Sequence, residues 1–504
     1  MTGKPLDTVQ ISNCPRISTA HVTRFRPRYS PISPSLIGRL FAASLIWLLQ
    51  SLPAQAHASE QALVLLLPTD LYIIAGCAAV VASILGVAFL SEARLMAAFK
   101  PLPLFSIKLS DNVTHVTSFG SMTFLFAISA IGAFGTHDPL NNLFSLTIWA
   151  IWWVGLVLVH GVLGNLWQAL NPWTGLYQIL IGYQSPQPYL KLPKFCGHWI
   201  AVLIFLAFGM FEIADPAPED PARLTKFVLG YWLFTFVGMI LFGGKVWLQR
   251  CEPFTILFGL VAAISPVRWV PRLSIGLPGW SLFSLSIPSV SLAIFSLTLL
   301  GVGSFDGLKE SFWWLAKIGV NPLMFPGKSA IFWQSIFGIL AVNVALVMVF
   351  AAVVFVGIRA ANASLASQDR VAFTTAFCWF SLSIIPIALG YHFAHFFIYF
   401  LVNSQYALLA LTDPLITGAN YLGLAKTQVT TGFLKTKDSV QVVFFIQAGA
   451  VVASHVVSVL IAHGMAARLY QTKKQTLISQ IPLAIFMILY TIFGLWLLAT
   501  PRGM

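Results

Sequence analysis

Long apolar segments with few charges constrain this chain more than any other feature of its sequence. Of its 504 residues, 58% are hydrophobic and only 9% are charged, whereas soluble domains carry about 25% charged residues. A helix needs ~20 apolar residues to cross a bilayer, and about ten segments approach that length. These segments are 71–90, 117–134, 143–162, 198–214, 225–242, 288–303, 330–357, 371–401, 439–463 and 478–500. The predicted fold is therefore all-α, a polytopic membrane helix bundle.

The first 56 residues predict a leader rather than part of the bundle. Arg24, Arg26, Arg28 and Arg39 precede the short apolar run "LFAASLIWLLQSL", and the small-residue stretch "AQAHA" follows it. This order of basic region, apolar core and small residues is typical of a secretory signal peptide. We expect cleavage after Ala56, with residues 57–504 forming one transmembrane helical domain. An uncleaved first helix is the alternative.

The positive charge of the chain indicates membrane topology rather than a nucleic-acid partner. The formal net charge is +13, but Lys and Arg lie in short loops between apolar segments, and no basic cluster lies beside an aromatic groove. With the mature N-terminus outside, the larger share of these loop cations falls on the inner side. The acidic loop "DPAPEDPA" falls on the outer side. The prediction is a bacterial inner-membrane protein with a periplasmic mature N-terminus and the lipid bilayer as its surroundings.

Several shorter features refine this picture. The pieces "NLWQALNPWTGLY" and "EPFTILFGLVAAI" are too short to span, so we expect them to lie at the interface or to re-enter the bilayer. Segment 371–401 is long, and Pro386 is placed to kink it. The five cysteines have no paired spacing, which indicates neither a disulfide framework nor a thiolate metal site.

The stretch "GYHFAHFFIYF" places two histidines within a very apolar segment. Residues three and four apart share a helix face, so His392, His395, Tyr399, Asn403 and Tyr406 form one polar stripe. Such side chains are costly against lipid. We therefore expect this stripe to face the bundle interior or a wet cavity.

A second polar stripe is predicted on the following helix, from Gln447, Ser454, His455 and Ser458. Interhelical hydrogen bonding is the plain structural interpretation of both stripes, since Asn, Ser, Gln and His join helices in membranes. The functional interpretation is a divalent metal site, because neutral imidazole is a common metal ligand.

A metal site of this kind also needs a carboxylate. Asp306 in "GSFDG", at the outer end of a predicted helix, is the first candidate, and Asp138 in "THDPL" is better explained as a turn cap. The predicted ligands are therefore His392, His395 and Asp306. Tyr399 and His455 are the predicted catalytic residues that orient water or substrate.

Several blocks of the chain together resemble a known family. The similarity runs from about Leu65 to the last predicted helix and is carried by "LLLPTDLYIIAG", "DPLNNLFSLTIWAIWWVGLVLVHGVLGNLWQALNPWTG", "FVLGYWLFTFVGMILFG", "GSFDG" and "IALGYHFAHFFIYFLVNSQ". The chain resembles the bacterial multi-pass membrane proteins known as fenitrothion hydrolases. The resemblance implies hydrolysis of a lipophilic organophosphorus triester, but it supplies no catalytic residues.

This implied reaction is compatible with the predicted site, and two other classes remain open. A metal ion lowers the pKa of bound water toward ~7 and polarises a phosphoryl group. One alternative is an electron-transfer subunit, with His455 and either His392 or His395 as axial haem ligands. The other alternative is a transporter or permease, which the intramembrane polar stripes would also suit.

Overall fold

The computed structural model describes residues 63–106, 110–182, 188–269, 272–322, 327–424 and 428–501. The predicted leader 1–56 and its cleavage site, together with the loop residues Lys108 and Lys426, lie outside the described residues.

The bundle of membrane helices predicted from the sequence is confirmed. Nine segments within the described residues are long and apolar enough to cross a membrane. They contain α3 (Thr69–Phe89), α5 (Asp111–Phe134), α6 with η1 and α7 (Leu143–Leu146, Thr147–Leu156, Val157–Leu163), α11 (Pro221–Phe242), α14 (Val290–Lys309), α16 (Phe332–Asn362), α17 with α18 (Phe373–Ser381, Ile385–Thr412), α19 (Lys437–Leu469) and α20 (Lys473–Ala499). The one remaining predicted segment, 198–214, forms α10 (Trp199–Ala214), which is apolar but only 16 residues long.

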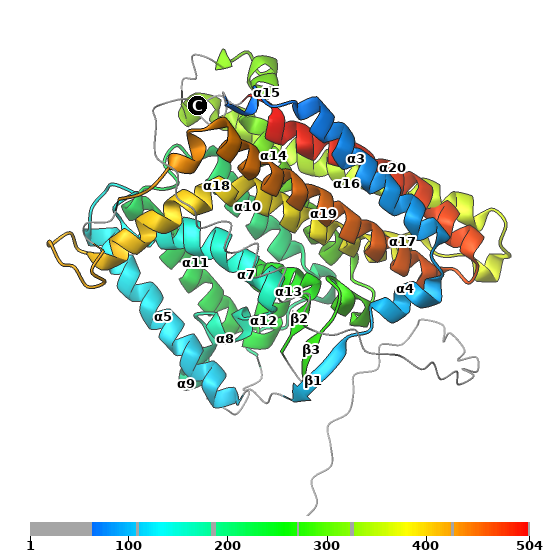
Figure 1. The fold of residues 1–504 in the computed structure, drawn as a ribbon. Helices are drawn as coiled ribbons and strands as arrows, with labels where there is room; N and C mark the ends of the chain where they lie inside the picture. Colours follow the sequence, from blue (N-terminus) through cyan, green and yellow to red (C-terminus); the bar gives the residue numbers. More distant parts are fainter. Residues whose placement is uncertain are drawn as a thin grey trace, which may run out of the picture. The chain divides into compact units, whose positions relative to one another are not determined.

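Two groups of helices meet at a central pair. Helices α3, α16, α19 and α20 lie side by side (Figure 1), while α5 packs against α11 in the other group. Between the groups, α14 contacts α10, α16 and α18, and α18 contacts η1 and α19. The spans that contain α14 and α18 are the most buried of the nine. Polar residues on α14 and α18 are therefore shielded from lipid.

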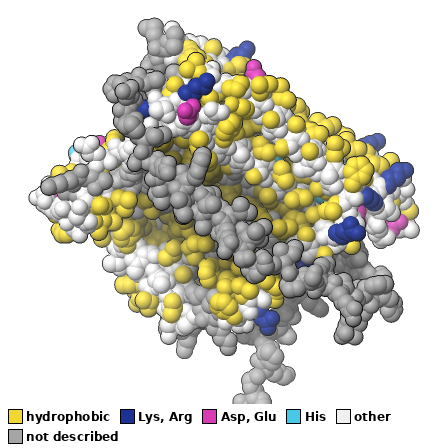
Figure 2. Space-filling model, viewed as in Figure 1, with side chains coloured by type: hydrophobic (Ala, Val, Ile, Leu, Met, Phe, Trp, Pro, Cys, Tyr) yellow, Lys and Arg dark blue, Asp and Glu magenta, His cyan; other side chains and the backbone are white. Residues whose placement is uncertain are grey.

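The outer surface of the described helices suits a hydrocarbon environment. Hydrophobic side chains cover most of the visible face, and Lys and Arg gather toward its edges (Figure 2). Highly exposed apolar side chains such as Phe89, Phe134 and Val116 lie on membrane-length helices. A protein with this surface is a multi-pass membrane protein.

The predicted interruption near Pro386 is present. Helix α17 ends at Ser381, a single 3₁₀ turn η7 (Leu382–Ile384) follows, and α18 begins at Ile385 with Pro386 in its first turn. Proline is favourable there because a first-turn N–H has no intrahelical acceptor. The 3₁₀ turn therefore separates α17 from the part of the span that carries the first polar stripe.

The short pieces predicted at the interface are helical and do not span. The first forms α8 (Trp167–Leu170) and α9 (Thr174–Ile181), and the second forms α13 (Pro253–Ile264). Helix α13 contacts α7, α10 and α18, and Glu252 caps it by accepting hydrogen bonds from the Phe254 and Thr255 amides. It is therefore buried among the long helices rather than lying at a lipid interface.

A small sheet was not predicted from the sequence. Strand β3 (Arg272–Ile275) pairs antiparallel with β1 (Leu102–Ser106) on one side and with β2 (Val267–Arg268) on the other. The remaining short helices are α4 (Glu92–Ala98), η2 (Lys194–Cys196), α12 (Gly244–Arg250), η3 (Trp280–Ser284), α15 (Phe312–Lys317), η5 (Lys328–Ile331), η6 (Ser367–Asp369) and η8 (Gly432–Leu434). The four described cysteines are free thiols.

Candidate functional site

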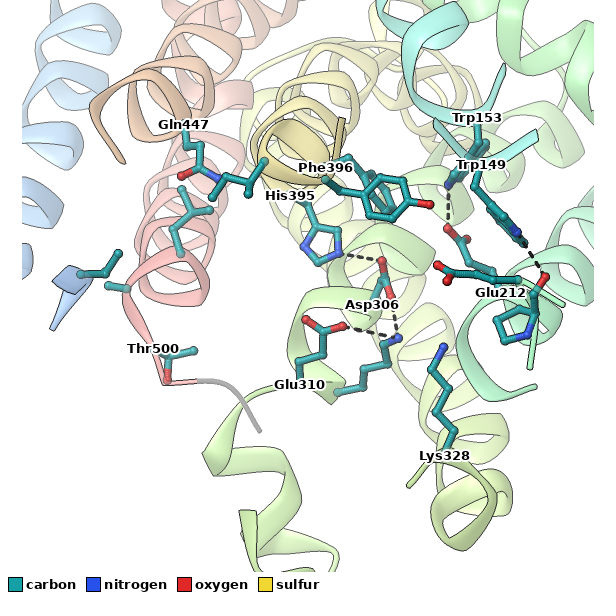
Figure 3. A pocket seen from close by; sticks show the side chains of 18 residues that line it. Trp149, Trp153, Glu212, Asp306, Glu310, Lys328, His395, Phe396, Gln447 and Thr500 are labelled. Atoms are coloured by element: carbon teal, nitrogen blue, oxygen red, sulfur yellow. Dashed lines mark hydrogen bonds and ion pairs between the residues drawn. The ribbon is translucent and has the colours of Figure 1, made fainter. Parts of the chain in front are cut away.

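A cavity of about 400 Å³ lies where several helices end, and we call it the polar cavity. The carboxyl ends of α10, α14 and α20 and the amino end of η5 border it, and α18 passes along it. Its ionisable lining residues are Glu212, Glu219, Asp306, Lys309, Glu310, Lys328, His395 and Tyr399. Figure 3 shows these side chains converging from elements far apart in the sequence.

The centre of this arrangement is a buried carboxylate with two partners. Asp306 Oδ2 lies 2.8 Å from Nε2 of His395, and Asp306 Oδ1 lies 2.9 Å from Nζ of Lys309. All three side chains are no more than 10% exposed. Because the carboxylate accepts the Nε2 hydrogen of His395, Nδ1 is the basic nitrogen of the neutral ring. The geometry is that of a carboxylate–histidine pair neutralised by an internal ammonium group.

Small residues on α14 bring this pair together. A Cβ added to Gly307 would clash with the Tyr391 hydroxyl, and one added to Gly303 would touch the same ring. Glycines four residues apart allow close packing of membrane helices. Tyr391 of α18 therefore rests directly against α14, and its ring stacks on His395 one turn later. This contact brings His395 within reach of Asp306.

Glu212 and Trp153 form a second polar contact beside the first. Nε1 of Trp153 donates to Oε1 of Glu212 at 2.6 Å, and Nε2 of His392 donates to the Trp153 carbonyl at 3.1 Å. Trp153 lies in η1, a π-helical segment within the third span. Such segments are rare and frequently occur at functional sites. The extra width of this turn presents both the indole and the carbonyl of Trp153 toward α10 and α18.

The charge of the polar cavity is unusual for a membrane interior. Four carboxyl side chains and two ammonium groups line it, together with the indoles of Trp149 and Trp153 and the phenol of Tyr399. An acidic excess disfavours anions by like-charge repulsion and accommodates neutral or cationic ligands. The cavity therefore suits a neutral substrate better than a phosphate monoester.

The structure separates the predicted catalytic residues. Tyr399 lines the polar cavity with His395 and Asp306, but His455 does not. Nδ1 of His455 donates to the Val451 carbonyl of its own helix, and Nε2 has no partner among the described residues. The predicted catalytic role of His455 has no support from this geometry.

Two residues of the second polar stripe join helices, whereas Ser454 and His455 bond to the Val451 carbonyl of their own helix. Gln447 donates to the Ala394 carbonyl of α18 at 2.7 Å, and Ser458 donates to the Ser383 carbonyl. For α19, interhelical hydrogen bonding is therefore the better interpretation.

Asp138 accepts hydrogen bonds from the Leu140 amide and the Asn141 side chain, as predicted for a turn cap.

The donor set does not fit the predicted divalent metal. Within the described residues, no group of three His, Cys, Asp or Glu side chains is arranged to hold an ion. Nε2 of His392 is bonded to a backbone carbonyl, and both oxygens of Asp306 already have partners, one of them an ammonium group. A dication beside Lys309 would face direct charge repulsion. Haem ligation by His455 with His392 or His395 is equally unsupported, because His455 does not line the polar cavity that His395 borders, and Nε2 of His392 is bonded to the Trp153 carbonyl.

Sequence reasoning missed part of the cavity lining. Glu212 is the only charged residue in the apolar helix α10, and an ionisable residue within a membrane segment marks a functional site by default. That signal was present and would have added Glu212 to the candidates. Lys309 and Lys328 had no such signal, since each lies at a helix end where cations are ordinary.

Comparison with known proteins adds no family to this description. No family model, no curated protein and no solved structure matches the chain.

Proposed function

We propose that the protein is a membrane-embedded hydrolase of neutral, lipophilic esters. Organophosphorus triesters are the class that the sequence resemblance implies. The observation that carries the proposal is the contact of Asp306 with His395, made inside a cavity that also presents Lys309. A carboxylate that holds a histidine in one tautomer creates a general base at the other ring nitrogen.

The proposed step uses only side chains of this chain. Nδ1 of His395 takes a proton from water while the water oxygen bonds to phosphorus. The phosphorus–oxygen bond to the aryl group then breaks, and the electron pair leaves with the nitrophenolate. Lys309 and Lys328 stabilise the negative charge that grows on the phosphoryl oxygen, as positive groups aimed at developing charge do. Tyr399, which also lines the polar cavity, would hold the water.

Hydrolysis is tested on the purified protein in lipid nanodiscs. We expect it to release 4-nitrophenolate from a neutral dialkyl 4-nitrophenyl phosphate faster than empty nanodiscs do. Metal analysis of the same sample and an assay after chelation address the predicted divalent ion, and we expect activity to survive chelation. Absence of nitrophenolate release contradicts the proposal. If the sample contains a stoichiometric metal and chelation abolishes activity, the reaction depends on a metal ion after all.

A transporter or permease is the second candidate. It is favoured by one observation, namely that Asp306, Lys309 and His395 form an ion-paired network within membrane-spanning segments. Uptake of an intact triester into liposomes that contain the protein, without release of nitrophenolate, favours this candidate over hydrolysis.

We infer that the protein lies in the bacterial inner membrane with its mature N-terminus in the periplasm. Under this topology the polar cavity faces the periplasm, because the acidic loop Asp215–Asp220 directly follows α10. We expect periplasm-specific reporter fusions to be active in this loop and inactive after Arg268. The reverse pattern contradicts the orientation and moves the cavity to the cytoplasmic side. N-terminal sequencing that finds residues before His57 contradicts cleavage of the leader.

A further inference from the structure

A second and larger cavity lies next to the polar cavity. Its volume is about 980 Å³, and helices α5, η1, α10 and α11 form most of its wall. The lining is almost entirely apolar, and we call it the apolar chamber. Side chains at its rim are exposed, among them Phe124 at 52%, Phe227 at 50% and Ile151 at 41%. Of these helices, α5, η1 and α11 belong to membrane-length segments, so we expect the exposed rim to face lipid.

The two cavities share one lining residue, Trp149. Its indole N–H donates to the Pro218 carbonyl at 3.2 Å, and its ring stacks on Phe208 and Phe211 of α10. Phe208 and Phe211 face the apolar chamber, while the next residue, Glu212, faces the polar cavity. One turn of α10 and one tryptophan therefore form the boundary between the two compartments.

We propose that the substrate is an amphiphile whose alkyl chain occupies the apolar chamber while its neutral ester head lies in the polar cavity. This inference rests on the proposed function and names its substrate class. An alkyl chain alone gains little binding free energy when it moves from lipid into the chamber, because the bilayer is equally apolar. Selectivity therefore requires both parts on one molecule, so that the head anchors the chain.

Gly120 of α5 offers a direct way to fill the chamber. It lines the chamber, and a Cβ added there meets no atom within 4 Å. Leucine is also a better helix former than glycine, so Gly120→Leu adds volume without disturbing α5. Gly230 on α11 is the matched control, because it has the same open surroundings but does not line the chamber.

The experiment measures binding separately from turnover. The probes are hydrolysis-resistant dialkyl phosphonates with ethyl or octyl chains, titrated by calorimetry into the protein in nanodiscs. We expect Gly120→Leu to weaken binding of the octyl probe by about tenfold, since the added side chain takes space that the octyl chain would occupy. The ethyl probe and the Gly230→Leu control should change by less than about twofold.

A second variant changes the chamber in the opposite direction. Phe124→Ala removes a lining ring, so we expect the preferred alkyl chain to become longer than in the wild-type protein. Binding that ignores chain length and is unchanged in both variants overturns the two-compartment inference, even if triesters are hydrolysed. Chain-dependent binding without any hydrolysis keeps the amphiphile site and contradicts only the proposed reaction.

Discussion

Asp306→Asn is expected to lower triester hydrolysis by about 10³- to 10⁴-fold, because the amide keeps the shape of the carboxylate but cannot stabilise a protonated His395. The same change leaves the buried ammonium of Lys309 with a weaker partner. Removal of one member of a buried ion pair costs about 3–5 kcal/mol. Turnover and thermal unfolding are therefore measured together on the variant in nanodiscs.

Loss of folding and loss of chemistry are separated by a double variant. Asp306→Asn with Lys309→Met removes both charges, so we expect much of the stability to return while hydrolysis stays low. Asp138→Asn is the matched control, because Asp138 caps an exposed turn and its side chain lies outside the cavities. Hydrolysis that recovers with stability in the double variant contradicts a catalytic role for Asp306.

His395→Gln and His455→Gln are expected to differ by at least about 10²-fold in kcat, which is the usual contribution of a general base. Both histidines lie in apolar helices on polar stripes, and the sequence predicted both at the site, His395 as a ligand and His455 as a catalytic residue. Glutamine at position 395 can still donate to Asp306 but cannot take up a proton near neutral pH. At position 455 the change alters a packing contact worth about 0.6 kcal/mol.

The two histidine variants distinguish a role of His395 in the reaction from a purely structural role. Equal kcat losses in both variants would show that the effect is structural, and unchanged kcat in His395→Gln would remove it from the reaction. Bound metal is measured in both proteins, and we expect no difference between them. A metal present in wild type and absent in His395→Gln supports the ligand set predicted from the sequence.

The outline of the bundle could be predicted because hydrocarbon imposes one rule on every span. Each apolar segment must satisfy its own backbone as a helix, so hydropathy alone places elements such as α3, α16 and α20. The sheet could not be predicted in this way. Strand β1 is separated in sequence from β3, and neither strand is long enough to show a pattern of its own.

The candidate site was predicted in part, for a reason that lies in the packing of two helices. The expectation that a polar helix face turns away from lipid correctly placed His395 in the interior. Asp306 was chosen because it lies at the outer end of its helix. Their 2.8 Å contact depends on Gly303 and Gly307 admitting Tyr391, which is a property of two helices together. Without that contact, no sequence rule distinguishes His395 from His392 or His455.

The short length of α10 has a consequence for the fate of the product. At 16 residues, it spans about 24 Å, less than the ~30 Å of a typical hydrocarbon core. Lipid must thin beside such a helix, or polar groups must reach down to its end. Glu212 lies within the last turn of α10, so the aqueous phase reaches toward the proposed reaction centre. A lipid-soluble ester would then enter from the bilayer while its anionic diester product departs into water, repelled by the acidic wall. Hydrolysis in this position would act as a one-way transfer from membrane to solvent.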